Sequence, residues 1–125
     1  MTETSALTKT ISFISRSTPY GQDQAKACLD MVLSAAVFDQ KINFIFMDDG
    51  VWQLKRGQTP STIDAKDLSA TFAALALYDV NELYVEASSM LERGLDADSL
   101  VVPVTILESA KIAELINQSD VVFTL

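Results

Sequence analysis

The sequence is poor in the residues that bind metals, form disulfides or act as histidine-dependent catalysts. It contains one cysteine, Cys28, and no histidine among 125 residues. One thiol cannot form an internal disulfide, which is typical of a protein that works in a reducing compartment. Because the usual ligands of zinc and iron are missing, we expect no metal site. The lack of histidine also excludes a hydrolase triad of the usual type.

Basic residues and long apolar runs are scarce as well. Nine Lys and Arg stand against seventeen Asp and Glu, a formal net charge of −8. Binding to a nucleic-acid backbone normally needs a basic patch, so we expect no direct contact with nucleic acid. No apolar run approaches the roughly 18 residues of a membrane-spanning helix, and the N-terminus (Met1 to Ser5) is unlike a signal peptide. We therefore expect a cytoplasmic protein without a membrane segment.

Apolar residues, by contrast, are abundant. They make up 49% of the chain, and the mean hydropathy is +0.22. A chain of this length suits a single domain over residues 1–125. For a small domain without a membrane segment, such a composition favours burial of part of the surface against other subunits.

Strand-like and helix-like segments alternate along the sequence. The predicted strands are residues 10–14, 41–47, 82–86, 100–106 and 121–125. The predicted helices are residues 21–38, 68–78, 88–94 and 109–117, and residues 57–62 form a loop by composition. This alternation predicts one three-layer α/β domain with a parallel sheet of about five strands and helices on both faces. Cys28 falls on the apolar face of the first helix, where we expect an unreactive core thiol.

The loop from Ser15 to Gly21 leaves a cofactor-binding function open. It joins a strand to a helix, the place where flavodoxin-like proteins hold a phosphate. The hydroxyls of Ser15, Ser17 and Thr18 favour that hypothesis. Against it stand a single glycine, the missing amide donor of Pro19 and the absence of a Walker-type motif. Helix capping by serine and threonine explains the same residues, and we expect no cofactor.

The most informative stretch is the strand-end segment, Asp48 to Gln58, which follows the second strand. Its pattern D-D-G-V-W-Q-L-x-x-G-Q resembles the DsrE/DsrF-like sulfur-relay family, and within it the DsrF/TusC type of subunit. Thr18-Pro19-Tyr20-Gly21, Leu91 to Leu95 and the closing stretch from Glu114 to Phe123 are also similar to family motifs. The resemblance spans nearly the whole chain in the same order and spacing.

The resemblance implies a sulfur-relay subunit that does not itself carry sulfur. Sulfur carriers of the DsrE/TusD type hold a persulfide on a cysteine at the end of the third strand, and Glu86 occupies that position here. A carboxylate has no thiolate to take up sulfane sulfur, so we expect Glu86 to be an exposed acid or a subunit contact. The implied partners are DsrE/TusD-type and DsrH/TusB-type subunits in a heterohexamer. The implied process is 2-thiolation of the tRNA wobble uridine or, alternatively, dissimilatory sulfur oxidation.

The same segment is predicted to contact those partners. Tryptophan and arginine often anchor protein interfaces, and strand ends are where α/β domains build their sites. The interface candidates are Asp48, Asp49, Gly50, Val51, Trp52, Leu54, Arg56 and Glu86. For Trp52, packing on the core of its own domain is an equally open alternative. A homo-oligomeric DsrE-like protein without relay partners is also left open.

Overall fold

The computed structural model describes five strands and the helices around them. The described residues are 9–16, 24–38, 40–55, 75, 80, 82–100 and 103–125. The strands are β1 (Thr10–Ser15), β2 (Lys41–Phe46), β3 (Leu83–Glu86), β4 (Thr105–Leu107) and β5 (Val121–Thr124). The helices are α2 (Gln24–Ala36), α4 (Ala87–Glu92) and α5 (Ser109–Asn117), with the 3-10 helices η1 (Asp48–Leu54) and η3 (Ala97–Ser99). The predicted helix 68–78, apart from Leu75, the predicted loop 57–62 and Arg56 lie outside the described residues.

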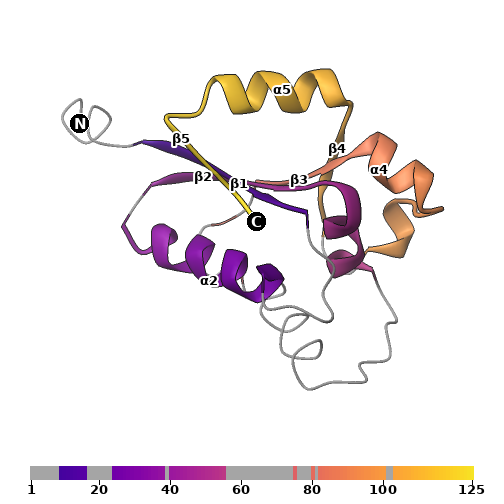
Figure 1. Cartoon of the computed structure of the whole chain (residues 1–125), viewed down its shortest axis with the longest axis horizontal. Helices are drawn as coiled ribbons and strands as arrows, with labels where there is room; N and C mark the ends of the chain where they lie inside the picture. The colour runs from indigo at the N-terminus through magenta and orange to yellow at the C-terminus, as the bar shows by residue number, and fades with distance from the viewer. Residues whose placement is uncertain are drawn as a thin grey trace.

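The strands form one parallel sheet in the order β4-β3-β2-β1-β5. Helix α2 lies on one face of this sheet and α5 lies on the other (Figure 1). The predicted fold class, a three-layer α/β domain with a parallel sheet of about five strands, is confirmed.

Both faces of the central strands carry apolar side chains because a helix covers each face. Neighbouring side chains along a strand point to opposite faces. On the α2 side, Phe13 and Phe44 pack with Cys28 of the helix in a large core cluster. On the α5 side, Ile14 and Ile45 pack with Ile112 in a smaller one. The apolar residues that β1 and β2 direct to both faces therefore follow from the inner positions of these strands in the sheet.

Several predicted boundaries differ from the structure by one or two residues, and the start of the fourth strand differs by five. The fourth strand begins at Thr105 rather than Leu100, and Leu100 instead forms an isolated antiparallel bridge with Lys55. Pro103 lies between Leu100 and Thr105. Because proline has no N–H to donate to a strand ladder, the strand does not extend back to Leu100. The short helix α4 begins at Ala87, one residue earlier than predicted, and Gly94 follows it with φ +68. In the part of the chain that the structure describes, no helix is both long and apolar enough to cross a membrane.

Candidate functional site

The strand-end segment begins as the 3-10 helix η1, directly after β2. Asp48 opens it with φ +51, a left-handed conformation that aspartate tolerates better than most residues. The backbone N–H of Asp48 donates to Ser89 Oγ at 2.9 Å, and that of Gly50 donates to the Met47 carbonyl at 2.8 Å. These bonds fix the first turn of η1 against α4.

Gly50 lets η1 pack directly on the end of β1. A Cβ atom at this position would lie 2.0 Å from the carbonyl oxygen of Ser15. The same oxygen accepts a hydrogen bond from the Met47 N–H at 3.1 Å, and Ser15 Oγ accepts one from Gln53 Nε2 at 2.7 Å. The close approach of the two backbones therefore requires glycine at this point.

Three interface candidates of this segment belong to the interior of the domain. Val51 and Leu54 are fully buried, and Gly50 is buried against β1. Residues three apart share one face of a 3-10 helix, so Val51 and Leu54 point together into the core. The expectation that these three residues contact a neighbouring subunit is corrected, because their surfaces are already covered within the chain.

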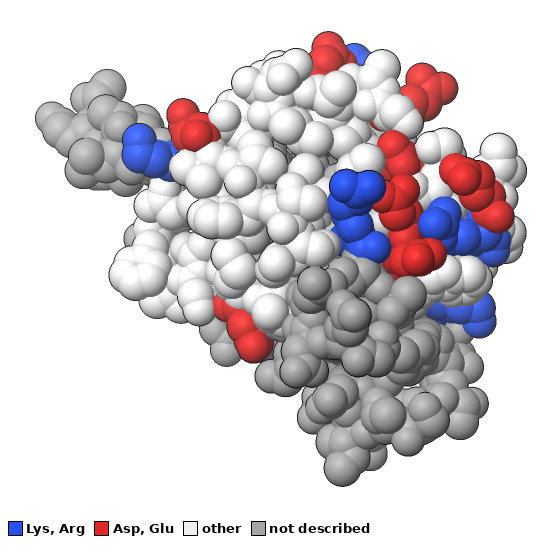
Figure 2. All heavy atoms as spheres, in the orientation of Figure 1, with Lys and Arg blue, Asp and Glu red and all other residues white. Residues whose placement is uncertain are grey.

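Asp48 and Asp49 remain at the surface and pair with arginines from two other elements. Arg16 Nε lies 2.7 Å from Asp48 Oδ2, and Arg93 Nη2 lies 3.1 Å from Asp49 Oδ1. Arg93 also donates to the Ser89 carbonyl at 3.1 Å. Exposed pairs of this kind contribute little stability, but they hold acids and bases at defined places. Figure 2 shows the resulting mixture of charges on the right of the molecule.

Glu86 differs most from its predicted role. Its side chain is buried, with 8% of its surface exposed, and both carboxylate oxygens accept hydrogen bonds. Ser89 Oγ donates to Oε1, and Ser109 Oγ donates to Oε2 at 2.9 Å. The expectation of an exposed strand-end acid is corrected: Glu86 ties the end of β3 to the first turns of α4 and α5. Ser89, Ser109 and Arg93 were not predicted as site residues.

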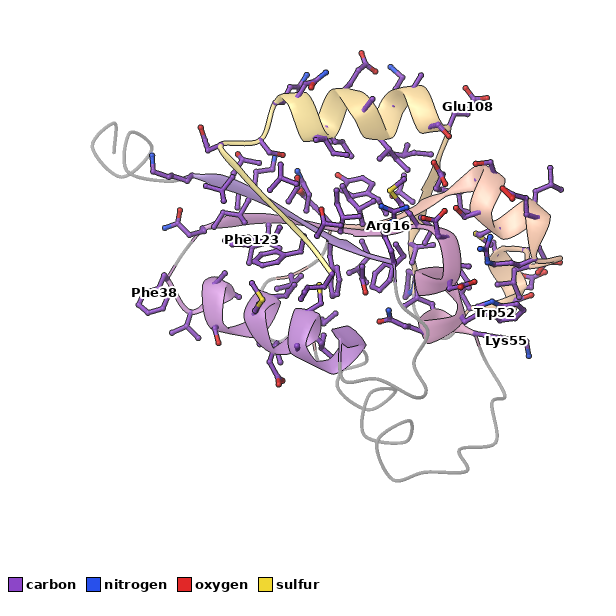
Figure 3. All side chains as sticks on the ribbon, viewed as in Figure 1. Arg16, Phe38, Trp52, Lys55, Glu108 and Phe123 are labelled. Atoms are coloured by element: carbon purple, nitrogen blue, oxygen red, sulfur yellow. The ribbon has the colours of Figure 1, made fainter. Side chains whose placement is uncertain are left out.

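Trp52 and Lys55 lie at the outer end of the segment. Figure 3 shows both side chains at the edge of the domain, close to the end of η1. Trp52 is half-buried. Part of the Trp52 side chain is therefore exposed to solvent, and the rest packs against the domain.

The remaining predicted groups are less available for chemistry. Cys28 is fully buried, and burial raises the pKa of its thiol from 9.0 to about 11, with a hydrogen bond from Ser15 acting in the opposite direction. The prediction of a core thiol is confirmed. Ser15 is also fully buried, so its hydroxyl is not available to a phosphate in the predicted cofactor loop. Ser17 and Thr18 lie outside the described residues. Among the residues that the structure describes, no cluster of acids and cysteine could hold a metal ion.

The chain is similar in sequence to proteins of known name. The chain is 37% identical to the intracellular sulfur oxidation protein DsrF of Allochromatium vinosum, over 96% of this chain and 98% of the relative. It is 36% identical to the protein TusC homolog of Pseudomonas aeruginosa, covering 95% of this chain and 100% of that protein. It is 38% identical to the protein TusC of Escherichia fergusonii, covering 91% and 97%.

Solved structures share the fold at lower identity. The ychN protein of E. coli has a TM-score of 0.81 at 19% identity, covering 94% of this chain and 99% of that one. MTH1491 of Methanobacterium thermoautotrophicum has a TM-score of 0.69 at 12% identity, with the same coverage. These two likenesses concern the fold alone. Residues 9–125 match the DsrE/DsrF-like family, and the chain belongs to that family.

Proposed function

We propose that the chain is a subunit of a sulfur-relay complex and does not itself carry sulfur. Relatives named DsrF and TusC, at 36–38% identity over most of the chain, support a place in sulfur relay. The process we propose is cytoplasmic 2-thiolation of the tRNA wobble uridine. The chain takes part through its partners, because an acidic protein with a net charge of −8 is poorly suited to bind RNA directly.

The environment of Glu86 is the observation that carries the non-catalytic role. The resemblance places the carrier cysteine of related subunits at this position, yet here the side chain is a carboxylate. Both of its oxygens accept hydrogen bonds from serine hydroxyls. Transfer of sulfane sulfur needs a thiolate that attacks a disulfide or persulfide sulfur. A carboxylate cannot form that sulfur–sulfur bond, so no sulfur is accepted at the end of β3.

Cys28 does not replace the missing carrier. Its side chain has no exposed surface, and its raised pKa of about 11 leaves the thiol protonated near neutral pH. The thiolate is the nucleophile in sulfur exchange, and an incoming donor must also reach it. Cys28 fails both requirements.

The partners we propose are the DsrE/TusD-type and DsrH/TusB-type subunits, two copies of each with two of this chain. The contact residues we propose are Asp48, Asp49 and the outer side of Trp52, which lie at the surface of the strand-end segment, together with Arg56, which lies outside the described residues. Half-buried tryptophan bordered by charged side chains is typical of an interface centre with a polar rim. Removal of the Trp52 side chain should weaken assembly while leaving the fold intact.

The test uses a bacterial strain that lacks its own subunit of this type. Wild type and Cys28→Ala should both restore 2-thiouridine in tRNA, measured by mass spectrometry of nucleosides. When a radioactive sulfur donor is supplied to the purified complex, the label should appear on a partner cysteine and not on this chain. Loss of thiolation by Cys28→Ala in a complex that still assembles would contradict the proposal.

A parallel test concerns the contact surface. Trp52→Ala should reduce recovery of the partners in co-purification, whereas Leu91→Ala, a change at an 81% exposed residue of α4, serves as the matched control. If Trp52→Ala lowers the unfolding temperature but leaves assembly unchanged, Trp52 belongs to the core and not to the contact.

Dissimilatory sulfur oxidation is the second candidate process. It is favoured by the 37% identity to the intracellular sulfur oxidation protein DsrF of Allochromatium vinosum. Expression in a sulfur-oxidising strain that lacks its DsrF separates the two processes. Restored sulfur oxidation there, without restored tRNA thiolation in the first strain, would favour the second candidate.

A further inference from the structure

The strand-end segment contains a dipeptide that is chemically unstable in flexible chains. Asp49 is followed by Gly50, and no other aspartate or asparagine of the sequence precedes a glycine. In an Asp–Gly pair the backbone nitrogen of the glycine attacks the side-chain carboxyl carbon of the aspartate, because no Cβ atom of the second residue hinders the approach. The end product of this reaction is isoaspartate.

The reaction exchanges one bond at the Asp49 side chain for another. The Gly50 nitrogen forms a bond to Cγ of Asp49, the carboxyl OH leaves as water with the amide proton, and a five-membered succinimide ring results. Water then opens this ring at either carbonyl. Opening at the former side-chain carbonyl restores aspartate, whereas opening at the backbone carbonyl leaves the chain running through the side chain of residue 49. One water is lost and one is regained, and nothing is oxidised or reduced.

Packing fixes the glycine of this pair. A Cβ atom at position 50 would lie 2.0 Å from the backbone carbonyl oxygen of Ser15. Gly50 is therefore required by the packing of η1 on β1, and the unstable bond comes with it. Protection of this bond has to come from the surroundings of the two reacting groups.

The attacking nitrogen is held inside the domain. The Gly50 N–H donates to the Met47 carbonyl at 2.8 Å, and Gly50 is buried. The nitrogen becomes nucleophilic only when it loses this proton to a base in solution. Because the N–H is buried and hydrogen-bonded, a base reaches it only after local opening of η1.

The carboxyl group is held by Arg93 of the neighbouring turn. Arg93 Nε and Nη2 donate to Asp49 Oδ1 at 3.2 and 3.1 Å. Arg93 Nη1 donates to the Ser89 carbonyl at 3.1 Å, and the arginine side chain is only 20% exposed. Because two donors of an anchored arginine hold one oxygen, the carboxyl group does not rotate freely toward the Gly50 nitrogen.

We propose that Asp49–Gly50 is a latent site of isoaspartate formation, kept closed in the folded chain by the Gly50–Met47 hydrogen bond and the Arg93 contact. Opening of η1 releases both reacting groups. Isoaspartate adds one carbon to the backbone at residue 49, and the close-packed end of β1 leaves no room for it. Once the bond has isomerised, η1 does not return to its place, and the buried side chains of Val51 and Leu54 lose their packing. This chemistry is independent of whether the chain relays sulfur.

The test follows isoaspartate in the purified full chain during incubation at physiological temperature and pH. Mass spectrometry of proteolytic peptides locates it at residue 49, and Asp49→Glu is the control, because glutamate keeps the carboxylate but does not form the five-membered ring. The folded chain should isomerise at least about tenfold more slowly than the chain unfolded in guanidinium chloride, because the reaction waits for local opening.

Arg93→Ala tests the hold on the carboxyl group. It should raise the rate in the folded chain by about two- to fivefold, the range expected from the loss of an exposed ion pair, and leave the rate in the unfolded chain unchanged. Lys111→Ala, which removes the exposed pair with Glu114 on α5, should change neither rate.

Amide hydrogen exchange supplies a measurement that needs no substitution. The Gly50 N–H of the folded wild type should exchange at least about tenfold more slowly than in the unfolded chain, because exchange requires the same opening. Isomerised chains should also unfold at a lower temperature than fresh ones. Three results would overturn the proposal: equal isomerisation in folded and unfolded chains, an unchanged rate in folded Arg93→Ala, or unprotected exchange at Gly50.

Discussion

Replacement of Gly50 by alanine tests the contact between η1 and the end of β1. The added Cβ would lie 2.0 Å from the Ser15 carbonyl oxygen, 2.7 Å from its carbonyl carbon and 3.2 Å from the Cα atom of Arg16. All three atoms are backbone, so no side chain can rotate away. Relief requires η1 to move outward by more than about 1 Å from a close-packed interior.

That movement has two costs. Overpacking of a rigid site costs about 1–3 kcal/mol. The displaced Ser15 carbonyl also accepts the Met47 N–H at 3.1 Å, and the loss of one such bond costs about 1 kcal/mol. We therefore expect the free energy of unfolding to fall by about 2–4 kcal/mol, and the midpoint temperature by roughly 10 °C.

Circular dichroism during heating and urea titration measures this loss, and Gly94→Ala is the matched control. Gly94 has φ +68, and a Cβ added there would meet no atom within 4 Å, so its cost is backbone strain alone, about 1 kcal/mol. Gly50 is not among the residues of positive φ, and its cost arises from lack of space. If Gly50→Ala were no less stable than Gly94→Ala, the close packing of η1 on β1 would be refuted.

Three further changes test the network around Glu86, the buried thiol and the outer ion pair. Ser109→Ala removes the donor to Glu86 Oε2 and should lower the free energy of unfolding by about 1–2 kcal/mol in urea titration; a loss below about 0.5 kcal/mol would contradict the network. Because burial raises the pKa of Cys28 from 9.0 to about 11, only the unfolded state loses this proton between those pH values. Stability should therefore fall more steeply over that range in wild type than in Cys28→Ala, and parallel pH curves would argue against a protonated core thiol. Arg93→Ala removes the ion pair with Asp49 and the hydrogen bond to the Ser89 carbonyl, and it should lower the free energy of unfolding by about 1 kcal/mol or less. If added salt did not change this loss, the ion pair would contribute nothing.

The sheet could be predicted from the sequence because its central strands are encoded by short segments rich in β-branched and aromatic residues. Residues 10–14 and 41–47 are such segments, and both lie in strands with only small shifts at their ends. The start of the fourth strand was predicted wrongly because an apolar run does not reveal which of its backbone groups form hydrogen bonds with a neighbouring strand. Leu100 pairs with Lys55 from a distant part of the chain, and the strand proper starts after Pro103.

The candidate site was only partly predictable. Topology indicates that the ends of β2 and β3 meet at one edge of the sheet, which brings Asp48 and Glu86 to the same region. It does not indicate that Glu86 would bond Ser109, which lies 23 residues further along the chain. Nor does the periodicity of so short a segment reveal a 3-10 helix, which is why Val51 and Leu54 were expected at the surface rather than in the core.

The position of β5 has a consequence for folding during synthesis. β5 is hydrogen-bonded to β1, and Asp120 accepts a bond from the Thr10 N–H across 110 residues of sequence. While the intervening residues leave the ribosome, one backbone edge of β1 lacks this partner strand, and Ile14, which packs on Ile112 of α5, remains uncovered. Unpaired apolar edges promote aggregation of nascent chains. The sheet closes only after residues 121–124 have emerged, so the pairing of β1 depends on residues that lie 110 positions further along the chain.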